Sequence, residues 1–517
     1  MSIDLFHQGP SMGEIIASAF QFGGDRVAFI HGDAELSFRQ CGDLISRIIQ
    51  ALEARGLKKG DSVATLSANR PEAYLMQAAS HVAGFRITLI NPNASEDDHA
   101  LILETAGVRA LFVDPPNFGD RARRLKARVP GLEMCFGLGP FEGFDDLLDV
   151  AQSFEAKPLQ PCANSDDECL VVFSGGTTGK PKGVSHRHGV QVTMTLLQMA
   201  DWDWPKEVRY LVMSPITHGG GAFITSTLLR GGTVVTHQGF SPDRFVDLVQ
   251  RHRITATFLV PTMVYALLEH PRARAADLSS LELIAYGAAP MLASRLAEAI
   301  ERFGSIFMQI YGQSEVPMCI TVMRRDDHDP VKYPQRLSSC GRPMFGAQLK
   351  LLDDAGREVT GDEVGEICLR GPLVTHGYID NPEETAQAWR DGWLYTGDRA
   401  RRDADGFLYI VDRSKDMVIT GGFNVYPREV EDAIAGHAGV QAVAVFGLPD
   451  PKWGEAVTAA VVRRPGVVVD AAELIALVKE RKGPVYAPKA IHFIDQLPVT
   501  GLGKLDKKAL RAQFKPQ

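Results

Sequence analysis

The chain has 517 residues, of which 45% are hydrophobic and 23% are charged, and its formal net charge is −8. Because this length exceeds what one hydrophobic core organises, we expect two or more domains. The acidic balance, without a long basic stripe in the sequence, argues against a general nucleic-acid-binding protein. No apolar run reaches the roughly 18 residues of a membrane span, so we expect a cytoplasmic protein without a transmembrane segment.

The first 290 residues alternate short apolar runs with helical patterns. The strand candidates are residues 27–30, 63–66, 86–90, 108–113, 169–173, 210–213, 233–235, 256–260 and 281–286. Ser37 can cap one of the intervening helices, and residues 71–82 form another. This alternation predicts an α/β fold with largely parallel sheets covered by helices.

The pattern changes after about residue 340. Short strands and tight turns, such as 353–356 and 403–406, predict an antiparallel sheet or small barrel. Beyond Asp412 a compact α/β unit remains, with strand candidates at 443–446 and 456–462. The seven cysteines are scattered and form no C-x-x-C pair, so we expect reduced thiols rather than disulfides or structural zinc.

A glycine-rich stretch follows the strand candidate 169–173. It reads Ser-Gly-Gly-Thr-Thr-Gly-Lys-Pro-Lys-Gly from Ser174 to Gly183. Its glycines let main-chain N–H groups approach a ligand closely, and its hydroxyl and lysine side chains suit a polyphosphate. The common motif G-x-x-x-x-G-K-[ST] does not fit, because Ser174 replaces its first glycine and Pro181 replaces its hydroxyl residue.

This stretch resembles the signature loop of the adenylate-forming enzymes, a family of acyl-CoA synthetases, adenylation domains and firefly-type luciferases. Every position of the family pattern fits, and further family motifs follow in order up to residue 505. The resemblance implies a large N-terminal domain, residues 1–412, with parallel-type sheets, helices and a small β-barrel-like subdomain. It also implies a small mobile α/β C-terminal domain, residues 413–517.

Four further motifs resemble parts of the family's nucleotide site. In the segment 309–315 the resemblance implies that Tyr311 stacks on adenine, Ser314 meets the α-phosphate and Glu315 holds Mg²⁺, a cation that prefers oxygen ligands. Asp398 and Arg413 resemble the residues that contact ribose and phosphate. The segment 287–290 matches the part that lines the adenine pocket, although an ordinary strand-to-helix turn is the alternative for these small residues.

The C-terminal part carries two more matches. Lys504 lies in a glycine-framed loop that resembles the family's catalytic lysine motif, which implies contact with the acid carboxylate and the α-phosphate. Lys415 corresponds to the family's hinge position, about which the small domain rotates after adenylation. Gly421 and Gly422 would then leave room for the pantetheine arm of CoA, and Trp453 either packs against CoA or belongs to the core.

The segment 214–223 occupies the place of the family's acid-binding element. His218 matches the histidine thought to gate the carboxylate, with a core histidine as the alternative, and Thr217 replaces the usual aromatic residue. The glycines that follow suggest a wide cavity for a branched or aryl-bearing acid. Since no charged residue lies between Met213 and Thr227, amino acids and dicarboxylates are disfavoured.

We therefore predict an acyl-CoA synthetase that uses ATP, Mg²⁺ and coenzyme A on a hydrophobic medium-chain, branched or aryl-alkanoic acid. The alternatives are an acyl-AMP ligase that loads a separate carrier protein, a luciferase-like oxygenase, and a nucleotide-binding regulator without catalysis. The oligomeric state stays open, with a homodimer as one option.

The predicted catalytic residues are Lys504, Glu315, His218 and Thr177. The predicted cofactor contacts are Ser174, Gly175, Gly176, Thr177, Thr178, Gly179, Lys182, Gly287, Ala288, Ala289, Pro290, Tyr311, Gly312, Gln313, Ser314, Asp398, Arg413, Gly421, Gly422 and Trp453. The predicted metal ligand is Glu315, the acid contacts are Thr217, His218, Gly219 and Gly220, and the hinge is Lys415.

Overall fold

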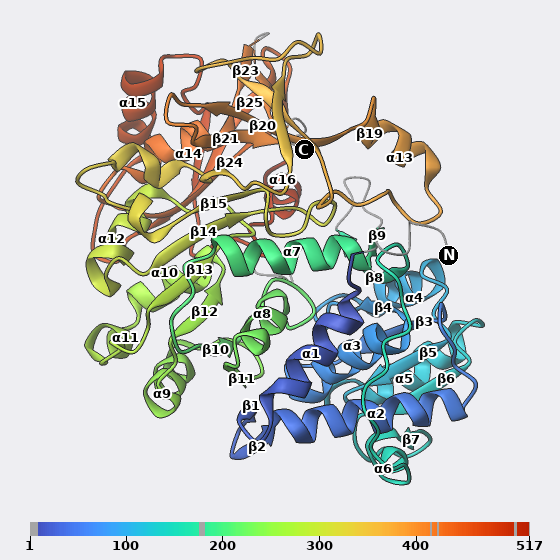
Figure 1. Cartoon of the computed structure of the whole chain (residues 1–517). Coiled ribbons are helices and arrows are strands. Elements are labelled where there is room, and N and C mark those ends of the chain that lie inside the picture. Colours follow the sequence, from blue (N-terminus) through green and yellow to red (C-terminus); the bar gives the residue numbers. More distant parts are fainter. Residues whose placement is uncertain (1–8, 175–180, 414–415, 421–422, 501–503, 516–517) are drawn as a thin grey trace.

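The computed structural model describes residues 9–174, 181–413, 416–420, 423–500 and 504–515. Two mainly parallel sheets organise the N-terminal part of these residues (Figure 1). In the described part, the first sheet has the strand order β7 (Asp145–Asp146), β6 (Met134–Gly137), β5 (Ala110–Val113), β3 (Ser62–Leu66), β4 (Arg86–Leu89), β8 (Glu168–Ser174) and β9 (Lys182–Arg187). All neighbours pair in parallel except β9, which runs antiparallel to β8.

The second sheet is longer and also mainly parallel. Among the described residues its order is β16 (Arg342–Pro343), β15 (Thr321–Met323), β14 (Phe307–Tyr311), β13 (Leu283–Tyr286), β12 (Ala256–Leu259), β10 (Arg209–Val212), β11 (Thr233–Thr236), β1 (Val27–His31) and β2 (Ala34–Ser37). The strands from β1 to β14 in this order pair in parallel, while β2 at one end and β15 and β16 at the other pair antiparallel. The predicted strands of this region are thus confirmed, with ends that differ by one or two residues.

Helices connect the parallel strands and cover the sheets. They are α1 (Met12–Gly23), α2 (Phe38–Ala54), α3 (Pro71–Ala83), α4 (Glu96–Thr105), α5 (Pro115–Arg128), α6 (Leu147–Gln152), α7 (His188–Asp201), α8 (Ile224–Leu229), α9 (Pro242–His252), α10 (Pro261–Glu269), α11 (Pro271–Ala275) and α12 (Ala293–Phe303). Ser37 caps α2 as predicted, because its hydroxyl accepts from the N–H of Gln40, whose side chain accepts in return from the Ser37 N–H.

One continuous apolar core joins the two large sheets. It contains Phe29 and Tyr210 from the second sheet and Val63 and Phe85 from the region of the first. A polar contact crosses the same region, where the Tyr74 hydroxyl of α3 lies 2.9 Å from a hydroxyl oxygen of α8. The two sheets therefore pack together as one body with a shared core.

Two smaller sheets follow along the chain. The first has the order β17 (Gln348–Leu352), β18 (Gly365–Arg370), β20 (Trp393–Arg402) and β19 (Trp389–Arg390), with β21 (Leu408–Arg413) paired to β20 and helix α13 (Pro382–Ala388) beside it. All its described pairs are antiparallel, as predicted for this region. The last sheet has the order β23 (Phe423–Val425), β22 (Val418–Thr420), β25 (Gly454–Arg463) and β24 (Val440–Asp450), with β26 (Ala490–Phe493) paired to β25.

The C-terminal sheet forms a small α/β unit with its own core. Helices α14 (Pro427–Ala435), α15 (Ala471–Lys482) and α16 (Lys507–Phe514) cover it, and its buried side chains come only from residues after 417. In Figure 1 this orange and red unit lies against the end of the green and yellow sheet. The predicted fold class, mixed α/β with a small C-terminal domain, is confirmed.

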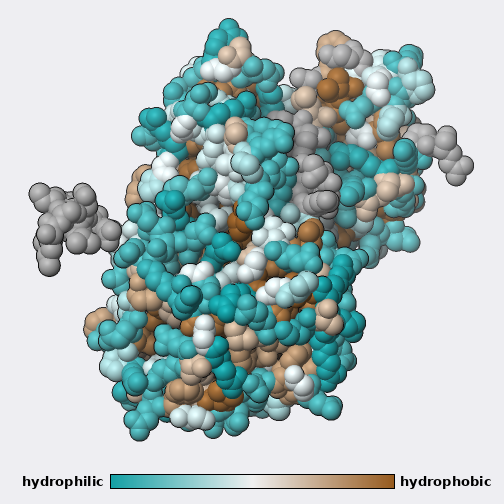
Figure 2. Space-filling model, turned by 90° about the vertical axis from the view of Figure 1, so that its right-hand side faces the viewer, coloured by the Kyte–Doolittle hydropathy of each residue, from teal (hydrophilic) through white to brown (hydrophobic). Residues whose placement is uncertain are grey.

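The surface and the state of the cysteines agree with what the sequence predicts. Figure 2 shows a mostly hydrophilic face on which apolar residues form small patches. Among the described residues, we find no helix with the length and apolar character that crossing a membrane requires. All seven cysteines are unpaired thiols, and burial raises the pKa of several of them, to about 12 for Cys41 and Cys340.

Candidate active site

The carboxyl ends of β13 and β14 bring two of the predicted loops together. These strands are parallel neighbours, so the loops that begin at Gly287 and Gly312 lie on the same edge of the sheet. A Cβ atom at Gly287 would lie 2.5 Å from the Ile310 carbonyl oxygen, and one at Gly312 would lie 2.3 Å from the Met318 nitrogen. Both positions therefore require glycine. Ala288 has a positive φ of 65°, which is a strained conformation for a residue with a side chain.

A hydrogen-bonded group connects this edge with the antiparallel sheet. The carboxylate oxygen Oδ2 of Asp398, which is 4% exposed, accepts from the Tyr311 hydroxyl at 2.6 Å and from the Gln313 side-chain amide at 2.6 Å. The amide of Gln313 also donates to the Thr396 carbonyl at 3.1 Å. In the pairing of β20 with β21, Asp398 stands opposite Arg413. The structure thus brings together predicted residues that are more than 80 positions apart in the chain.

Glu315 lies in a second polar group, built by the segment 375–389. Its carboxylate oxygen Oε1 accepts from the Tyr378 hydroxyl at 2.7 Å. Its main-chain carbonyl accepts from the N–H of Thr375 at 2.9 Å and from the hydroxyl of Thr375 at 3.0 Å. Lys182, predicted to contact phosphate, forms an ion pair with Glu384 of α13. The prediction contained neither Tyr378 nor Glu384.

The predicted acid-binding segment is held from the opposite sheet by Asn69. The buried Asn69 side chain follows β3 and donates to the Ser214 carbonyl at 2.9 Å and the His237 carbonyl at 3.0 Å, and it accepts from the Ile216 N–H at 2.8 Å. This residue was not predicted, because its partners are more than 140 residues away in the sequence. It fixes the loop that carries Thr217 and His218.

The glycines after His218 have a different role from the one predicted. A Cβ atom at Gly219 would lie 2.7 Å from the Phe258 ring, and one at Gly220 would lie 2.5 Å from the Ser214 hydroxyl. At Gly221 the Ile216 carbonyl oxygen would be only 1.8 Å away. The interpretation that these glycines widen an acid cavity is therefore wrong, since protein atoms already fill the space beside them.

The catalytic lysine candidate comes close to this loop. Burial, and second the positive charge of Lys504, lower the pKa of His218 to about 4, so the imidazole is neutral at pH 7. Its Nδ1 atom lies 3.0 Å from the Thr217 hydroxyl oxygen. The Lys504 loop is closed on itself by a hydrogen bond of 2.7 Å from the Thr500 N–H to the Lys504 carbonyl. Among the described residues, the charge of Lys504 thus acts on His218 of the predicted acid-binding segment.

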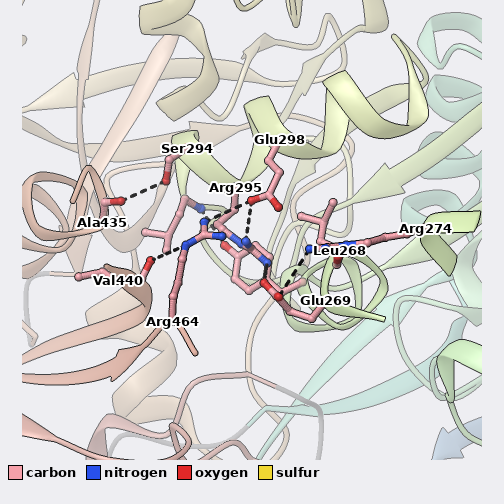
Figure 3. A network of polar contacts seen from close by, with 11 residues as sticks. Leu268, Glu269, Arg274, Ser294, Arg295, Glu298, Ala435, Val440 and Arg464 are labelled. Atoms are coloured by element: carbon pink, nitrogen blue, oxygen red, sulfur yellow. Dashed lines mark hydrogen bonds and ion pairs between the residues drawn. The ribbon is translucent and has the colours of Figure 1, made fainter. Parts of the chain in front are cut away.

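Polar contacts around α12 hold the C-terminal unit in this position (Figure 3). Arg295 is buried and donates to Glu269 at 2.7 Å and to Glu298 at 2.6 Å. Glu298 also pairs with Arg464 of the C-terminal unit at 3.4 Å, and Arg464 donates to the Val440 carbonyl. The Ser294 hydroxyl donates to the Ala435 carbonyl at 3.4 Å. Helix α12 begins at Ala293, so these contacts start shortly after the 287–290 segment along the chain.

Several predicted residues lie outside the described residues. They are Gly175, Gly176, Thr177, Thr178, Gly179, Lys415, Gly421 and Gly422, and the side chains of Ser174 and Arg413 belong with them. The strands on either side of the glycine-rich stretch, β8 and β9, pair antiparallel, with Ser174 opposite Lys182. Ile419 and Phe423, which flank Gly421 and Gly422, are 52% and 60% exposed.

Trp453 is not a core residue. Its side chain is 37% exposed, and the ammonium groups of Lys452 and Lys489 lie 4.9 and 5.1 Å from its ring centroid. Of the two predicted alternatives, the core position is therefore excluded. The aromatic ring and the two lysines form a surface that suits an anionic ligand with an apolar or aromatic part.

One group of potential metal ligands lies away from this site. The ligand atoms of His81, Cys169 and His188 are within 4.8 Å of one another, and all three residues are buried. However, the first N–H of α1, that of Met12, donates to Nδ1 of His188 at 3.1 Å. This bond assigns the ring proton to Nε2, the remaining nitrogen, which then has no lone pair for a metal. We interpret His188 as a buried hydrogen-bond acceptor for the first N–H of α1.

The chain is similar to proteins of known families over nearly its whole length. Residues 17–379 match the family model described as AMP-binding enzyme, and residues 429–504 match that of the AMP-binding enzyme C-terminal domain. A medium/long-chain-fatty-acid–CoA ligase of Mycobacterium tuberculosis is 46% identical over 516 residues, which cover 97% of this chain and 90% of the relative. A feruloyl-CoA synthase of an Amycolatopsis species is 36% identical, with 94% and 96% covered.

Among solved structures, an amide bond synthetase from Marinactinospora thermotolerans superposes with a TM-score of 0.90 at 34% identity. The superposition covers 98% of this chain and 100% of the synthetase. This likeness extends to both the large body and the C-terminal unit, because nearly every residue of each chain is included.

Proposed function

Because the chain belongs to the family of AMP-binding enzymes, we propose that it is an ATP-dependent acyl-CoA synthetase that acts on a hydrophobic carboxylic acid. A carboxylate oxygen of the acid attacks the α-phosphorus of ATP, so that acyl-AMP forms and pyrophosphate leaves. The CoA thiol then attacks the acyl carbonyl carbon, AMP leaves, and the thiol proton passes to solvent. The thioester is thus made in two displacements that share one acyl-AMP.

The position of Lys504 is the observation that carries this proposal. Burial is the main cause of the lowered pKa of His218, and the charge of Lys504 is the second, which supports one electrostatic site shared by the ammonium group and the acid-binding loop. A cation there can stabilise the charge that develops when a carboxylate attacks phosphorus. In this proposal Lys504 contacts the carboxylate and the α-phosphate, and neutral His218 lines the entry of the acid.

We assign the nucleotide to the edge formed by the loops after β13 and β14. Tyr311 would stack on adenine beside the 287–290 loop, and Asp398 would accept from the ribose hydroxyls after exchanging one of its present donors. The glycine-rich hairpin loop, which lies outside the described residues, would bind the phosphates. Ser314 would approach the α-phosphate.

Glu315 fits a Mg²⁺ ligand. Its carboxylate is a hard oxygen donor of the kind that Mg²⁺ prefers. In the described residues one oxygen accepts from Tyr378, and no hydrogen bond engages Oε2. When bound, Mg²⁺ would neutralise phosphate charge; the residue that would hold it is Glu315.

The thioester step would use the C-terminal unit, residues 413–517, after rotation about Lys415. The exposed hairpin β22–β23 with Gly421 and Gly422, together with Trp453, would then face the CoA arm. A cytoplasmic location and a homodimer stay predictions.

The acid is best sought among fatty and aryl-alkanoic acids. The relatives named above are ligases for medium- or long-chain fatty acids and for ferulate, and the segment from Met213 to Thr227 offers no charged side chain to a polar acid.

The purified chain should be incubated with ATP, Mg²⁺, CoA and a panel of aliphatic and aryl-alkanoic acids, with products identified by mass spectrometry. We expect acyl-CoA and AMP with at least one acid class. Adenylate without thioester would favour a carrier-loading ligase, and ATP binding without any product would favour a regulator.

A further inference from the structure

Tyr378 is fixed in the fold on several sides. The segment 377–379 pairs with β9, through hydrogen bonds from the Ile379 N–H to the Gly183 carbonyl at 2.8 Å and from the Ser185 N–H to the Gly377 carbonyl at 3.4 Å. The Tyr378 ring packs edge-on against Trp389, with the ring centroids 5.2 Å apart. The ring is thus held by both backbone and side-chain contacts, so its hydroxyl has a defined direction.

That hydroxyl points at the carboxylate assigned to Mg²⁺. The distance of 2.7 Å from the Tyr378 oxygen to Glu315 Oε1 is that of a strong hydrogen bond to a charged acceptor. A carboxylate bound on one oxygen presents the other in a fixed direction, and partners of metal ligands commonly tune affinity in this way. The two Thr375 contacts hold the Glu315 main chain from the same segment.

The same segment also holds the lysine next to the glycine-rich loop. Glu384 forms an ion pair with Lys182, and the Lys182 ammonium lies 5.4 Å from the centroid of the Tyr378 ring. The segment is closed internally, because the Thr385 hydroxyl accepts from the Tyr378 N–H at 3.0 Å and the Trp389 indole donates to the Thr375 carbonyl at 2.8 Å. Side chains of this segment therefore contact both Glu315 and Lys182, the two charged residues assigned to the phosphate region.

We propose that Tyr378 is a positioning residue that orients the Glu315 carboxylate for magnesium-bound ATP. The inference rests on the proposed function, since Glu315 is there the metal ligand. Tyr378 touches neither the acid nor the reacting atoms; it acts through Glu315. The hydroxyl, rather than the ring, carries this role.

Tyr378→Phe tests the inference, because it removes the hydroxyl and keeps the ring packed against Trp389. ATP binding is measured by calorimetry on the full chain without acid, so that no adenylate forms, at a series of Mg²⁺ concentrations and in EDTA. We expect about tenfold weaker ATP binding at a limiting Mg²⁺ concentration, the loss typical of one hydrogen bond to a charged group, and unchanged affinity in EDTA. Tyr409→Phe is the matched control. It also removes a tyrosine hydroxyl that donates to a carboxylate, that of Asp403 at a distance of 2.9 Å, but this pair is not part of the site.

A double-mutant cycle separates positioning from general stability. With Glu315→Gln as the background, Tyr378→Phe should cause no further loss of Mg²⁺-dependent ATP binding. Equal Mg²⁺ dependence in Tyr378→Phe and Tyr409→Phe, or additive losses in the cycle, would overturn the inference and leave the synthetase proposal standing. ATP binding by the unmodified chain that does not respond to Mg²⁺ would remove both the metal role of Glu315 and this inference.

Discussion

At the scale of single residues, the proposed adenylation depends on Lys504, a lysine near the end of the chain. Lys504 lies in a loop after β26, yet its charge reaches His218, which follows β10 in the large body. A residue in such a loop can enter and leave the site with its unit, so its removal should affect one half-reaction and spare the other.

Lys504→Ala should therefore reduce acyl-AMP formation by at least about a hundredfold, the scale typical for loss of one preorganised donor in a transition state. Thioester formation from supplied acyl-AMP should stay within about twofold, a difference too small to reflect the loss of a catalytic contact. Pyrophosphate release and acyl-CoA formation measure the two steps separately. Lys508→Ala, an exposed change on α16, is the control. Equal loss of both half-reactions in Lys504→Ala would refute the assigned role.

Asn69 provides a second test at this scale. Asn69→Ala removes three hydrogen bonds from the loop that carries Thr217 and His218, and it leaves buried backbone groups without these partners. We expect a loss of about 2 kcal/mol in the free energy of unfolding and a higher KM for the acid. Urea denaturation and steady-state kinetics measure both. Asn164→Ala is the control, because Asn164 is exposed, and an unchanged KM in Asn69→Ala would contradict the positioning role.

At the scale of elements, α12 connects the nucleotide edge with the C-terminal unit. Arg295 is buried between two carboxylates of the large body, and Glu298 shares its charge with Arg464 across the contact. Since Arg464 and Glu298 are partly exposed, the pair contributes modestly to stability, but it exists only while the C-terminal unit lies in this position.

Arg464→Met should therefore slow acyl-AMP formation by about two- to fivefold, which corresponds to the loss of one partly exposed ion pair. Thioester formation from supplied acyl-AMP should not slow. Arg463→Met is the neighbouring control, because Arg463 contacts Val469 and Phe493 within its own unit. An equal slowing of acyl-AMP formation in both variants would show that Arg464 acts through the stability of the unit instead.

The positions of the strands and helices along the chain were largely predictable, whereas the pairing of the strands in the sheets was not. Apolar runs such as residues 27–30 identify buried strands, because their side chains gain stability when they are removed from water. Strand β9, with the sequence Lys-Gly-Val-Ser-His-Arg, lacks such a pattern and forms because it pairs with β8 and Tyr378. The position of β1 between β11 and β2 depends on packing that no local pattern encodes.

The same distinction applies to the site. Tyr311, Glu315 and Lys504 belong to short motifs whose residue types reveal their chemistry. Asn69 and Tyr378 do not, because their importance comes from partners 145 and 63 residues away. The role of the glycines after His218 was misjudged for a related reason: the sequence gives their small size but not the Phe258 ring that fills the space.

At the scale of the whole molecule, buried histidines make stability depend on pH. Burial lowers the pKa of His81 to about 3 and of His186 and His328 to about 4, whereas unfolded histidine titrates near 6.5. Below pH 6.5 the unfolded chain binds protons that the folded chain does not, so stability falls as the pH decreases towards 4. Each of these histidines should lower the free energy of unfolding by about 1 kcal/mol at pH 5.5 relative to pH 7.

Denaturation midpoints between pH 7 and pH 5 check this prediction. His328→Gln should reduce the dependence, because it removes one of the groups that stay neutral in the fold. His31→Gln is the control, since His31 lies at the exposed end of β1. A midpoint that does not change between pH 7 and pH 5 would exclude the effect.

In the proposed function, the large body and the C-terminal unit form one site that first joins an acid to AMP and then transfers it to CoA. The most direct measurement is acid-dependent exchange of labelled pyrophosphate into ATP in the absence of CoA, with an acid that the panel has identified as a substrate. We predict exchange without CoA, because adenylation is a separate and reversible step, and we predict loss of this exchange in Lys504→Ala. Pyrophosphate exchange that requires CoA, or that persists undiminished in Lys504→Ala, would contradict the proposed function.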